Sequence, residues 1–427
     1  MRETGGSGPW THPAWRTLAW VLAIAPVLLL ACSPSRFVYD EVFYLGIALK
    51  KLRASGDVLD YLKNHWGMVP GPLHAAIHWA ASHWSEASPH GARLVNGLMF
   101  YGMVCALLSL LRSEGLDRRA GTLTALLALA VPPAWIIAGM ALTEMPALFC
   151  ITVAFWLVCQ QSAGASDQRL LPGILILAGL FAGLSVIGRQ PYLLIIPLLA
   201  ALLVWRRRSW MHAAVFASSS AIIPGALFLV WGGLTSPMTQ YANSGLRWEH
   251  GLLGMAYTGI FFTLLSPHWL LTVPWRLTAA AAAIATVLNL AFVGFQRPFM
   301  STLAERYLPI SAEMWGRLGG TACVAVAAVS VVAFVHHCWQ RRTDALYIVS
   351  NASVLAMVGI AAAISHLFSS RYPAMALPFL VVASMRHRKW DAVDLTAAVA
   401  GAVLGAVSLL SYYYLTPLRL SDFEPGG

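Results

Sequence analysis

Apolar residues fall in long runs along this chain, and most polar residues lie in short segments between the runs. The stretches Trp15–Cys32, Ala120–Ala138, Pro172–Ile187 and Leu318–Val335 are examples. A helix needs about 18–20 apolar residues to cross the ~30 Å hydrocarbon core of a bilayer. The pattern therefore predicts an all-α polytopic membrane protein.

Counting these runs predicts about 13 transmembrane helices, with ends defined only to within several residues. No internal repeat relates the two halves of the chain, which argues against a transporter built from repeats. The boundary between the fifth and sixth helices, at residues 188–191, has the weakest signal. The predicted helices are near residues 15–33, 93–111, 120–138, 145–161, 171–188, 191–205, 211–231, 252–272, 277–295, 318–336, 345–366, 373–385 and 393–414.

The composition supports a membrane protein and argues against a nucleic-acid-binding one. Hydrophobic residues make up 58% of the chain and charged residues only 11%, against about 25% charged residues in a soluble domain. The net charge is +10, but no basic stripe with interleaved aromatic residues is present. We therefore expect contact with membrane lipids and no nucleic-acid partner.

Basic residues are concentrated in alternate connections between the predicted helices. Because such residues hold loops in the cytoplasm, the N-terminus is predicted to lie inside. The chain is then an integral protein, expected in a bacterial plasma membrane, with a long first extracytoplasmic loop, 34–92, that carries amphipathic helices. The basic clusters are at residues 112–119, 206–208, 341–342 and 386–389.

Two modules follow from this arrangement. The N-terminal module, residues 1–232, includes the long first loop. The C-terminal module, residues 233–427, has shorter outer loops. Those loops are near residues 233–251, 296–317 and 366–372.

The first candidate chemistry lies just after the first predicted helix, where Asp40 and Glu41 stand among aromatic residues. Partial desolvation at a membrane surface raises the pKa of a carboxylate and suits it to general-base catalysis. Acidic residues are also common in the first turn of a helix, where they stabilise the exposed N–H groups. Both interpretations of the pair remain open at this stage.

Further along the first loop, Trp66 precedes a turn rich in proline and glycine, and His74 and His78 follow it. The turn is suited to form the wall of a pocket. The two histidines have the i, i+4 spacing of a shared metal site, but no glutamate completes a metalloprotease motif. An interfacial amphipathic helix with an aromatic belt is favoured, and no metal or other cofactor is predicted.

Three further charged positions interrupt or border apolar runs. Glu144 opens the fourth predicted helix, and Arg189-Gln190 and Arg371-Tyr372 follow later helices at their predicted outer ends. Charge in a membrane is costly, so such residues pair or mark functional sites. An arginine stays charged and can bind a phosphate through two hydrogen bonds. An anchor to lipid headgroups is the alternative for Arg189.

Taken in order, these motifs resemble the GT-C membrane glycosyltransferases, and most nearly the dolichyl-phosphate-glucose α-1,2-glucosyltransferase family. The resemblance covers residues 15–205 and then 366–380. Two departures are Tyr44, where that family tends to carry histidine, and Pro191, where a polar residue is usual. The Ala- and Arg-rich composition is typical of a bacterial relative. The matching stretches are Tyr39-Asp40-Glu41-Val42-Phe43, Arg93-Leu94-Val95-Asn96, Thr143-Glu144, Gly188-Arg189-Gln190 and Arg371-Tyr372-Pro373.

The resemblance implies an inverting, hexosyltransferase-like enzyme with an extracytoplasmic active site. Its donor would be a sugar linked to a polyprenyl phosphate. Its acceptor would be a lipid-linked glycan, an envelope polysaccharide or a protein. Asp40 or Glu41 would be the catalytic base, and the choice between them stays open. A transporter or flippase for an anionic lipid or small anion is the alternative.

The remaining candidate residues take supporting roles in this scheme. Arg189 and Arg371, with Gln190 and Tyr372, would bind the donor phosphate. Glu144, His74 and Trp66 would orient the substrates.

Overall fold

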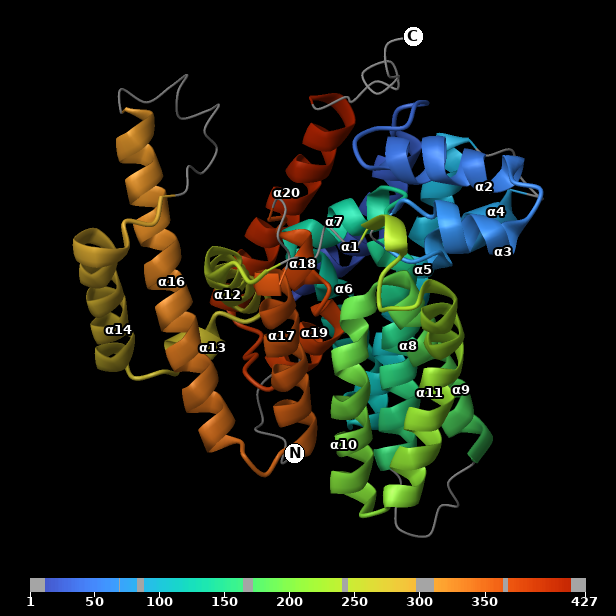
Figure 1. Cartoon of the computed structure of the whole chain (residues 1–427). Coiled ribbons are helices and arrows are strands. Elements are labelled where there is room, and N and C mark those ends of the chain that lie inside the picture. Colours follow the sequence, from blue (N-terminus) through green and yellow to red (C-terminus); the bar gives the residue numbers. More distant parts are fainter. Residues whose placement is uncertain are drawn as a thin grey trace. The chain divides into compact units, whose positions relative to one another are not determined.

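Every regular element in the described part of the chain is a helix, which confirms the all-α prediction (Figure 1). The structure is a computed structural model that describes residues 12–68, 70–82, 88–163, 172–239, 245–296, 311–363 and 368–415. Side-chain caps explain several helix starts. Asp117 accepts hydrogen bonds from two N–H groups at the start of α6 (Arg118–Leu126), and Asp391 does the same for α20 (Ala392–Tyr414). Such caps satisfy N–H groups that have no partner within the helix.

The chain forms two compact units, Met1–Asn243 with Trp390–Gly427, and Ser244–Lys389. The predicted boundary between the two modules, between residues 232 and 233, stays a prediction. In the structure α20 belongs to the first unit, where it contacts α7 (Pro132–Gly139). The other elements of the first unit are α1 (Pro13–Ala31), η2 (Val42–Leu49), α2 (Lys50–Ala54), α3 (Val58–Asp60), η3 (Tyr61–His65), α4 (Leu73–Ala81), α5 (Pro89–Ser113), η4 (Leu127–Ala130), α8 (Glu144–Ala163), α9 (Pro172–Gly188), η5 (Gln190–Leu194), α10 (Ile195–Arg207) and α11 (Trp210–Trp231). The second unit contains α12 (Trp248–Leu265), α13 (His268–Leu271), α14 (Trp275–Leu288), η7 (Asn289–Val293), α16 (Ala312–Gln340), α17 (Ala345–Ala363), α18 (Arg371–Ala374) and α19 (Leu377–Ser384).

Nine helices of the described residues are long and apolar enough to cross a membrane, or ten if one bent pair counts as a span. The predicted number of about 13 is therefore not confirmed. Even with the bent pair, three predicted spans have no candidate among the described residues, and the one at 171–188 is α9, which has only 17 residues. The predicted span at 252–272 is interrupted at Ser266, which is extended and precedes Pro267, and in the one at 373–385 the longest helix is the eight-residue α19. Pro267 follows the end of α12, and Pro378 lies at the start of α19.

The bent pair replaces the straight helix predicted at 120–138. The segment Arg118–Ala130 and helix α7 meet at 89°. Pro132 begins α7, and Val131 before it is extended, with φ −89° and ψ 109°. A proline inside a helix removes a hydrogen bond and collides with the preceding turn. The Pro132-Pro133 pair therefore turns the chain at this point, and α7 leads into the segment before Glu144.

Helices α8, α9, α10 and α11 pack side by side in the first unit (Figure 1). Gly179 and Gly183 lie four residues apart on α9 and face α11. A Cβ atom on Gly179 would stand 1.9 Å from the Ser219 hydroxyl oxygen, and one on Gly183 would stand 2.7 Å from the Ser220 carbonyl oxygen. Small residues at this spacing let membrane helices approach closely. The close packing fixes the end of α9, which leads into Arg189.

The first loop contains five short helical pieces, η2 through α4, in agreement with the predicted loop of amphipathic helices. They are the blue elements at one end of the first unit in Figure 1. The other predicted outer loops lie partly outside the described residues, which omit 240–244, 297–310 and 364–367.

Candidate active site

The turn that carries Asp40 has an unusual backbone conformation. Tyr39 has φ +50°, in the left-handed region, which costs a residue other than glycine roughly 1–2 kcal/mol. Non-glycine residues with this conformation are uncommon and often occur at functional sites. The carbonyl oxygen of Asp40 accepts hydrogen bonds from the N–H groups of Phe43 and Tyr44, both at 3.1 Å. The side chain of Asp40 is half-buried, so its carboxylate is neither fully hydrated nor fully enclosed.

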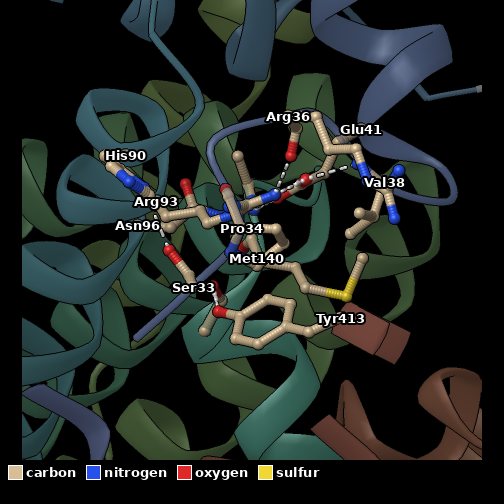
Figure 2. Close-up of polar contacts among 12 residues, drawn as sticks. Ser33, Pro34, Arg36, Val38, Glu41, His90, Arg93, Asn96, Met140 and Tyr413 are labelled. Carbon is tan, nitrogen blue, oxygen red and sulfur yellow. Dashed lines mark hydrogen bonds and ion pairs between the residues drawn. The ribbon is translucent and has the colours of Figure 1, made fainter. Parts of the chain in front are cut away.

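Arg93, in the first turns of α5, holds this segment in place (Figure 2). Its guanidinium donates to the carbonyl oxygens of Pro34 and Arg36, at 2.5 and 2.7 Å. It also donates to both carboxylate oxygens of Glu41, at 2.9 and 2.6 Å. Arg93 is fully buried, and a buried guanidinium requires this number of acceptors to offset its lost hydration. The segment 34–41 therefore wraps around one arginine.

Glu41 is also fully buried, and both of its oxygens have further partners. Oε2 accepts a hydrogen bond from the N–H of Val38 at 3.0 Å, and Oε1 accepts one from the N–H of Ala141 at 2.8 Å. The carboxylate thus joins the Asp40 turn to a second segment 100 residues away. Four hydrogen bonds with charged or backbone donors make Glu41 the anchor of the turn. Asp40, which is half-buried, is better placed to meet a substrate.

The short segment 140–143 connects α7 to Glu144, and three side chains clamp it. Asn96 donates from its amide nitrogen to the carbonyl oxygens of Met140 and Leu142, at 2.8 and 3.0 Å. Glu41 holds the N–H of Ala141, and His74 holds the carbonyl oxygen of the same residue at 3.1 Å. A buried, extended segment needs such partners for its backbone groups. The clamp fixes the position of Glu144 at the start of α8.

The hydrogen bonds of His74 and His78 fix their protonation. The Ala141 carbonyl can only accept, so His74 carries its proton on Nε2. Because the Asn96 amide nitrogen is engaged with carbonyl oxygens, its oxygen faces the Nε2 of His78 at 3.3 Å, and that nitrogen is the donor. Burial lowers the pKa of His78 from 6.5 to about 4. Burial, together with the nearby His78, lowers the pKa of His74 well below 6.5.

Both histidines are therefore neutral near pH 7. Their rings are in contact, with centroids 4.3 Å apart, but their Nε2 atoms bind different groups, a backbone carbonyl and an amide oxygen. This arrangement is structural, and it differs from a metal site, in which both rings aim at one ion. The pair stacks α4 against the clamped segment before Glu144.

The proline- and glycine-rich turn docks α4 on the end of α9. A Cβ atom on Gly71 would lie 2.0 Å from the Ile187 carbonyl oxygen, so only glycine fits there. The indole N–H of Trp66 donates to the Pro70 carbonyl at 2.9 Å and closes the turn. Trp66 and His74 line a cavity of about 10 Å³, which is no larger than one water needs. Both side chains therefore support the site from within the protein.

Arg189 and Glu144 form an ion pair at 2.5 Å. Glu144 begins α8, and Arg189 is the extended residue, with φ −147°, between α9 and η5. The side chain of Glu144 is fully buried and that of Arg189 is 11% exposed, so the pair lies at the edge of the interior. Arg189 also acts on the nearby His74, where its charge disfavours a second positive charge. Gln190 follows as a half-buried residue.

The second unit contains the other two predicted phosphate ligands. Arg371 begins α18 and is buried, and its backbone N–H and Nε both lie within hydrogen-bond distance of the Ser369 hydroxyl, at 3.3 and 3.2 Å. Tyr372 is half-buried and packs edge-on against Phe368, with ring centroids 6.3 Å apart. The role of Arg371 and Tyr372 as ligands of the donor phosphate stays a prediction.

The sequence identifies Arg93 and Asn96 only within a stretch that carries the family resemblance, without a role, and does not single out Tyr413. The ring of Tyr413 covers the Arg93 guanidinium at 5.1 Å. An arginine at the start of an apolar helix is a signal that could have identified Arg93, because such a charge must find partners. For Tyr413 no local signal exists, since its partners are more than 270 residues away in the sequence.

Neither a family model nor a curated protein matches the sequence. Two similar solved structures are of ArnT from Cupriavidus metallidurans, one in the apo state and one bound to undecaprenyl phosphate. The apo structure matches at 14% identity and a TM-score of 0.44, over 93% of this chain and 77% of ArnT. The complex matches at 14% identity and a TM-score of 0.41, over 94% of this chain and 78% of ArnT. Similarity at this level is distant, and the roles of the residues here follow from their own contacts.

Proposed function

We propose that this chain is an inverting membrane glycosyltransferase that takes a sugar from a polyprenyl-phosphate donor. The observation that carries the proposal is the clamp made by Glu41. One buried carboxylate ties the Asp40 turn, through Ala141, to the segment that leads into Glu144 and its partner Arg189. A half-buried carboxylate and a partly exposed arginine are thereby held by one rigid network. That combination fits a reaction in which a hydroxyl is deprotonated and a phosphate leaves.

We assign the role of general base to Asp40. In the proposed reaction an acceptor hydroxyl oxygen attacks the anomeric carbon of the donor sugar, and its proton passes to the Asp40 carboxylate. The bond between that carbon and the lipid phosphate breaks, and the electron pair leaves with the phosphate oxygen. A single displacement of this kind inverts the anomeric configuration. Glu41 is unsuited to the role because four donors already occupy its two oxygens.

Arg189 is the proposed ligand of the departing phosphate in the first unit. Fixed positive charge aimed at a developing anion is the usual source of catalysis by electrostatic stabilisation. Arg189 is paired with Glu144, so donor binding would add a second anion to an arginine that is already held in place. Gln190 is its proposed polar neighbour. In the second unit, Arg371 and Tyr372 are proposed phosphate ligands on the sequence pattern alone. His74 and Trp66 act indirectly, because they support the backbone around the site.

The ends of the helices support an extracytoplasmic site. In α5, Arg93 and Asn96 lie near the start, while Glu114 after its end pairs with Arg206 at 2.6 Å. In α8, Glu144 is the first residue, while the carbonyl of Gln161 near its end accepts from Arg207 at 2.8 Å. A helix of 20 residues is about 30 Å long, the thickness of the hydrocarbon core. The basic cluster and the proposed site thus lie at opposite ends of the same helices, as basic cytoplasmic loops require.

The proposed donor class follows from this location. A sugar phosphate carried by a lipid can reach helix ends from within the bilayer, and one phosphodiester needs only one or two arginines. A nucleotide sugar carries a diphosphate, which usually requires a metal with carboxylates or a glycine-rich phosphate loop, and the sequence has no such loop. The sugar as a hexose, the acceptor and the bacterial plasma membrane are further parts of the proposal.

The test supplies purified protein in liposomes with each donor class and one common acceptor pool of extracted membrane lipids. A panel of polyprenyl-phosphate monosaccharides should give a glycosylated product and free polyprenyl phosphate. Soluble nucleotide sugars should give neither. Transfer from a nucleotide sugar would contradict the proposed donor. Movement of the lipid phosphate across the bilayer without any product would favour a flippase instead.

A further inference from the structure

Helix α20 ends in three consecutive tyrosines that reach back to the candidate site. The ring of Tyr412 packs edge-on against Tyr39, with centroids 4.9 Å apart. The ring of Tyr413 covers Arg93 at 5.1 Å. The hydroxyl of Tyr414 donates to the Cys32 carbonyl, just before the segment that carries Asp40. Three neighbouring side chains of α20 thus contact the N-terminal segment at three points.

Tyr413 connects two supports of the site with one side chain. Its face is against the guanidinium that holds the segment 34–41 (Figure 2). Its hydroxyl donates to the carbonyl oxygen of Gly139 at 2.5 Å, at the end of α7 and directly before the clamped segment 140–143. The side chain is fully buried. An arginine over an aromatic face is attracted to it, and more strongly where both are desolvated.

Tyr412 acts at the other side of the same turn. Its partner Tyr39 is the residue with φ +50°, directly before Asp40. A left-handed conformation persists at such a residue only where the surroundings hold it. Edge-on aromatic packing supplies a directional contact of this kind. The direction in which the Asp40 side chain points from the backbone therefore depends on where the Tyr39 ring is held.

We infer that Tyr412 and Tyr413 are positioning residues for Asp40, so that the end of α20 sets the geometry of the catalytic carboxylate. The inference rests on the proposed function. Neither tyrosine is assigned a contact with substrate. Each acts through another residue, Tyr412 through Tyr39 and Tyr413 through Arg93 and Gly139. A misplacement of about 1 Å in a catalytic group can cost on the order of 100-fold in rate.

This role predicts a specific kinetic signature. Tyr412→Leu removes the ring contact, and Tyr413→Phe removes only the bond to Gly139. Each should lower kcat about 10-fold or more while the KM values of donor and acceptor change less than about 2-fold, because binding groups are untouched. Tyr412→Phe, which keeps the ring, should restore kcat. Val407→Ala, at an exposed position of the same helix, is the matched control and should behave as the unaltered protein.

A second variant separates positioning from general packing. Tyr39→Ala removes the partner ring of Tyr412. If Tyr412 acts through Tyr39, the double variant Tyr39→Ala/Tyr412→Leu should be no slower than Tyr39→Ala alone. Independent effects would instead multiply. Multiplied losses would overturn the assignment for Tyr412.

The closing experiment combines turnover with hydrogen–deuterium exchange on full-length protein in detergent micelles. Backbone amides of residues 36–44 should exchange at least about 10-fold faster in Tyr412→Leu and Tyr413→Phe, and at the original rate in Val407→Ala, because local opening sets exchange. Unchanged exchange in both tyrosine variants would overturn the inference. If the unaltered protein transfers no sugar, the proposed function fails, and the exchange result alone decides whether α20 braces the turn. Faster exchange with unchanged kcat would also overturn the positioning role.

Discussion

The guanidinium of Arg93 donates two hydrogen bonds to the carboxylate of Glu41, at 2.9 and 2.6 Å, although the two residues are 52 positions apart in the sequence. Both side chains are fully buried. The pair anchors the turn that carries Asp40 to the start of α5. It also separates the roles of two adjacent carboxylates, since Glu41 faces the interior while Asp40 is half-buried.

Arg93→Ala should destabilise the protein by about 3–5 kcal/mol, because it leaves the Glu41 carboxylate buried without its counter-charge. Thermal unfolding in detergent measures the loss, and Arg93→Lys should recover only part of it, since lysine lacks the planar fork. Arg317→Ala is the control, because its ion pair with Glu313 is exposed and such pairs add little. An unchanged unfolding temperature for Arg93→Ala would contradict the role of the pair.

The stability of the protein should fall as the pH drops from about 6.5 toward 4. The folded-state pKa of His78 is lowered to about 4 by burial, whereas an unfolded histidine titrates near 6.5. Below pH 6.5 the unfolded state binds the proton first, so stability is complete above that pH and is lost on acidification, by on the order of 3 kcal/mol at pH 4. The pKa of His74, which faces His78 and Arg189, is lowered as well.

His78→Gln tests this prediction, because it removes the titrating group and keeps a polar side chain. Unfolding temperatures measured from pH 4 to 7.5 should vary less steeply in the variant than in the unaltered protein. His65→Gln is the control, since His65 is in the same loop and 63% exposed, and it should leave the slope unchanged. Equal slopes for all three proteins would show that the buried pair does not titrate as described.

Topology can be tested with two matched serine-to-cysteine variants. Ser55 lies in the first loop, and Ser209 follows the basic cluster at 206–208, and both are half-buried. In a background in which the exposed Cys32 and Cys105 and the half-buried Cys338 are replaced by serine, an impermeant maleimide should label Ser55→Cys in intact cells. Ser209→Cys should react only after lysis. The reverse pattern would place the basic cluster outside and remove the extracytoplasmic site.

Arg189→Lys should weaken use of the donor more than use of the acceptor. Lysine keeps the charge but loses the two-bond geometry for phosphate. We expect the donor KM to rise about 10–100-fold, in line with the loss of a hydrogen bond to a charged group, and the acceptor KM to stay within about 2-fold. Steady-state kinetics in liposomes measure both, with Arg317→Lys as an exposed control. A donor KM that does not change would remove Arg189 from the phosphate site.

The sequence predicts the parts of the structure that depend on local pattern. Apolar runs identify most of the membrane helices, and polar interruptions such as Gly188-Arg189-Gln190 are true breaks, since α9 ends at Gly188. Two of the missing spans are short helices, the third is interrupted at Ser266, and the bend of 89° at Pro132 was not predicted. A run of apolar residues indicates burial or membrane contact, but it does not indicate whether a helix continues through the prolines within the run.

The sequence singled out charged residues of the candidate site, but it did not show the network that joins them. Asp40, Glu41, Glu144 and Arg189 stand out because charge is rare in this chain. Arg93, the partner of Glu41, and Tyr413, which covers Arg93, are distant from one another in the sequence, and only the folded chain brings them together. For the same reason the sequence could not separate Asp40 from Glu41, whose difference lies in burial.

The most direct test of the central claim is single-turnover transfer by Asp40→Asn. The variant keeps the shape of the side chain and removes the base, so it should fold normally and transfer sugar from a polyprenyl-phosphate donor about 10²–10⁴-fold more slowly. Asp60→Asn is the control, because Asp60 is an exposed carboxylate of the same loop, and it should transfer at the original rate. The account predicts this loss with an unchanged unfolding temperature. Transfer at a near-normal rate by folded Asp40→Asn would contradict it.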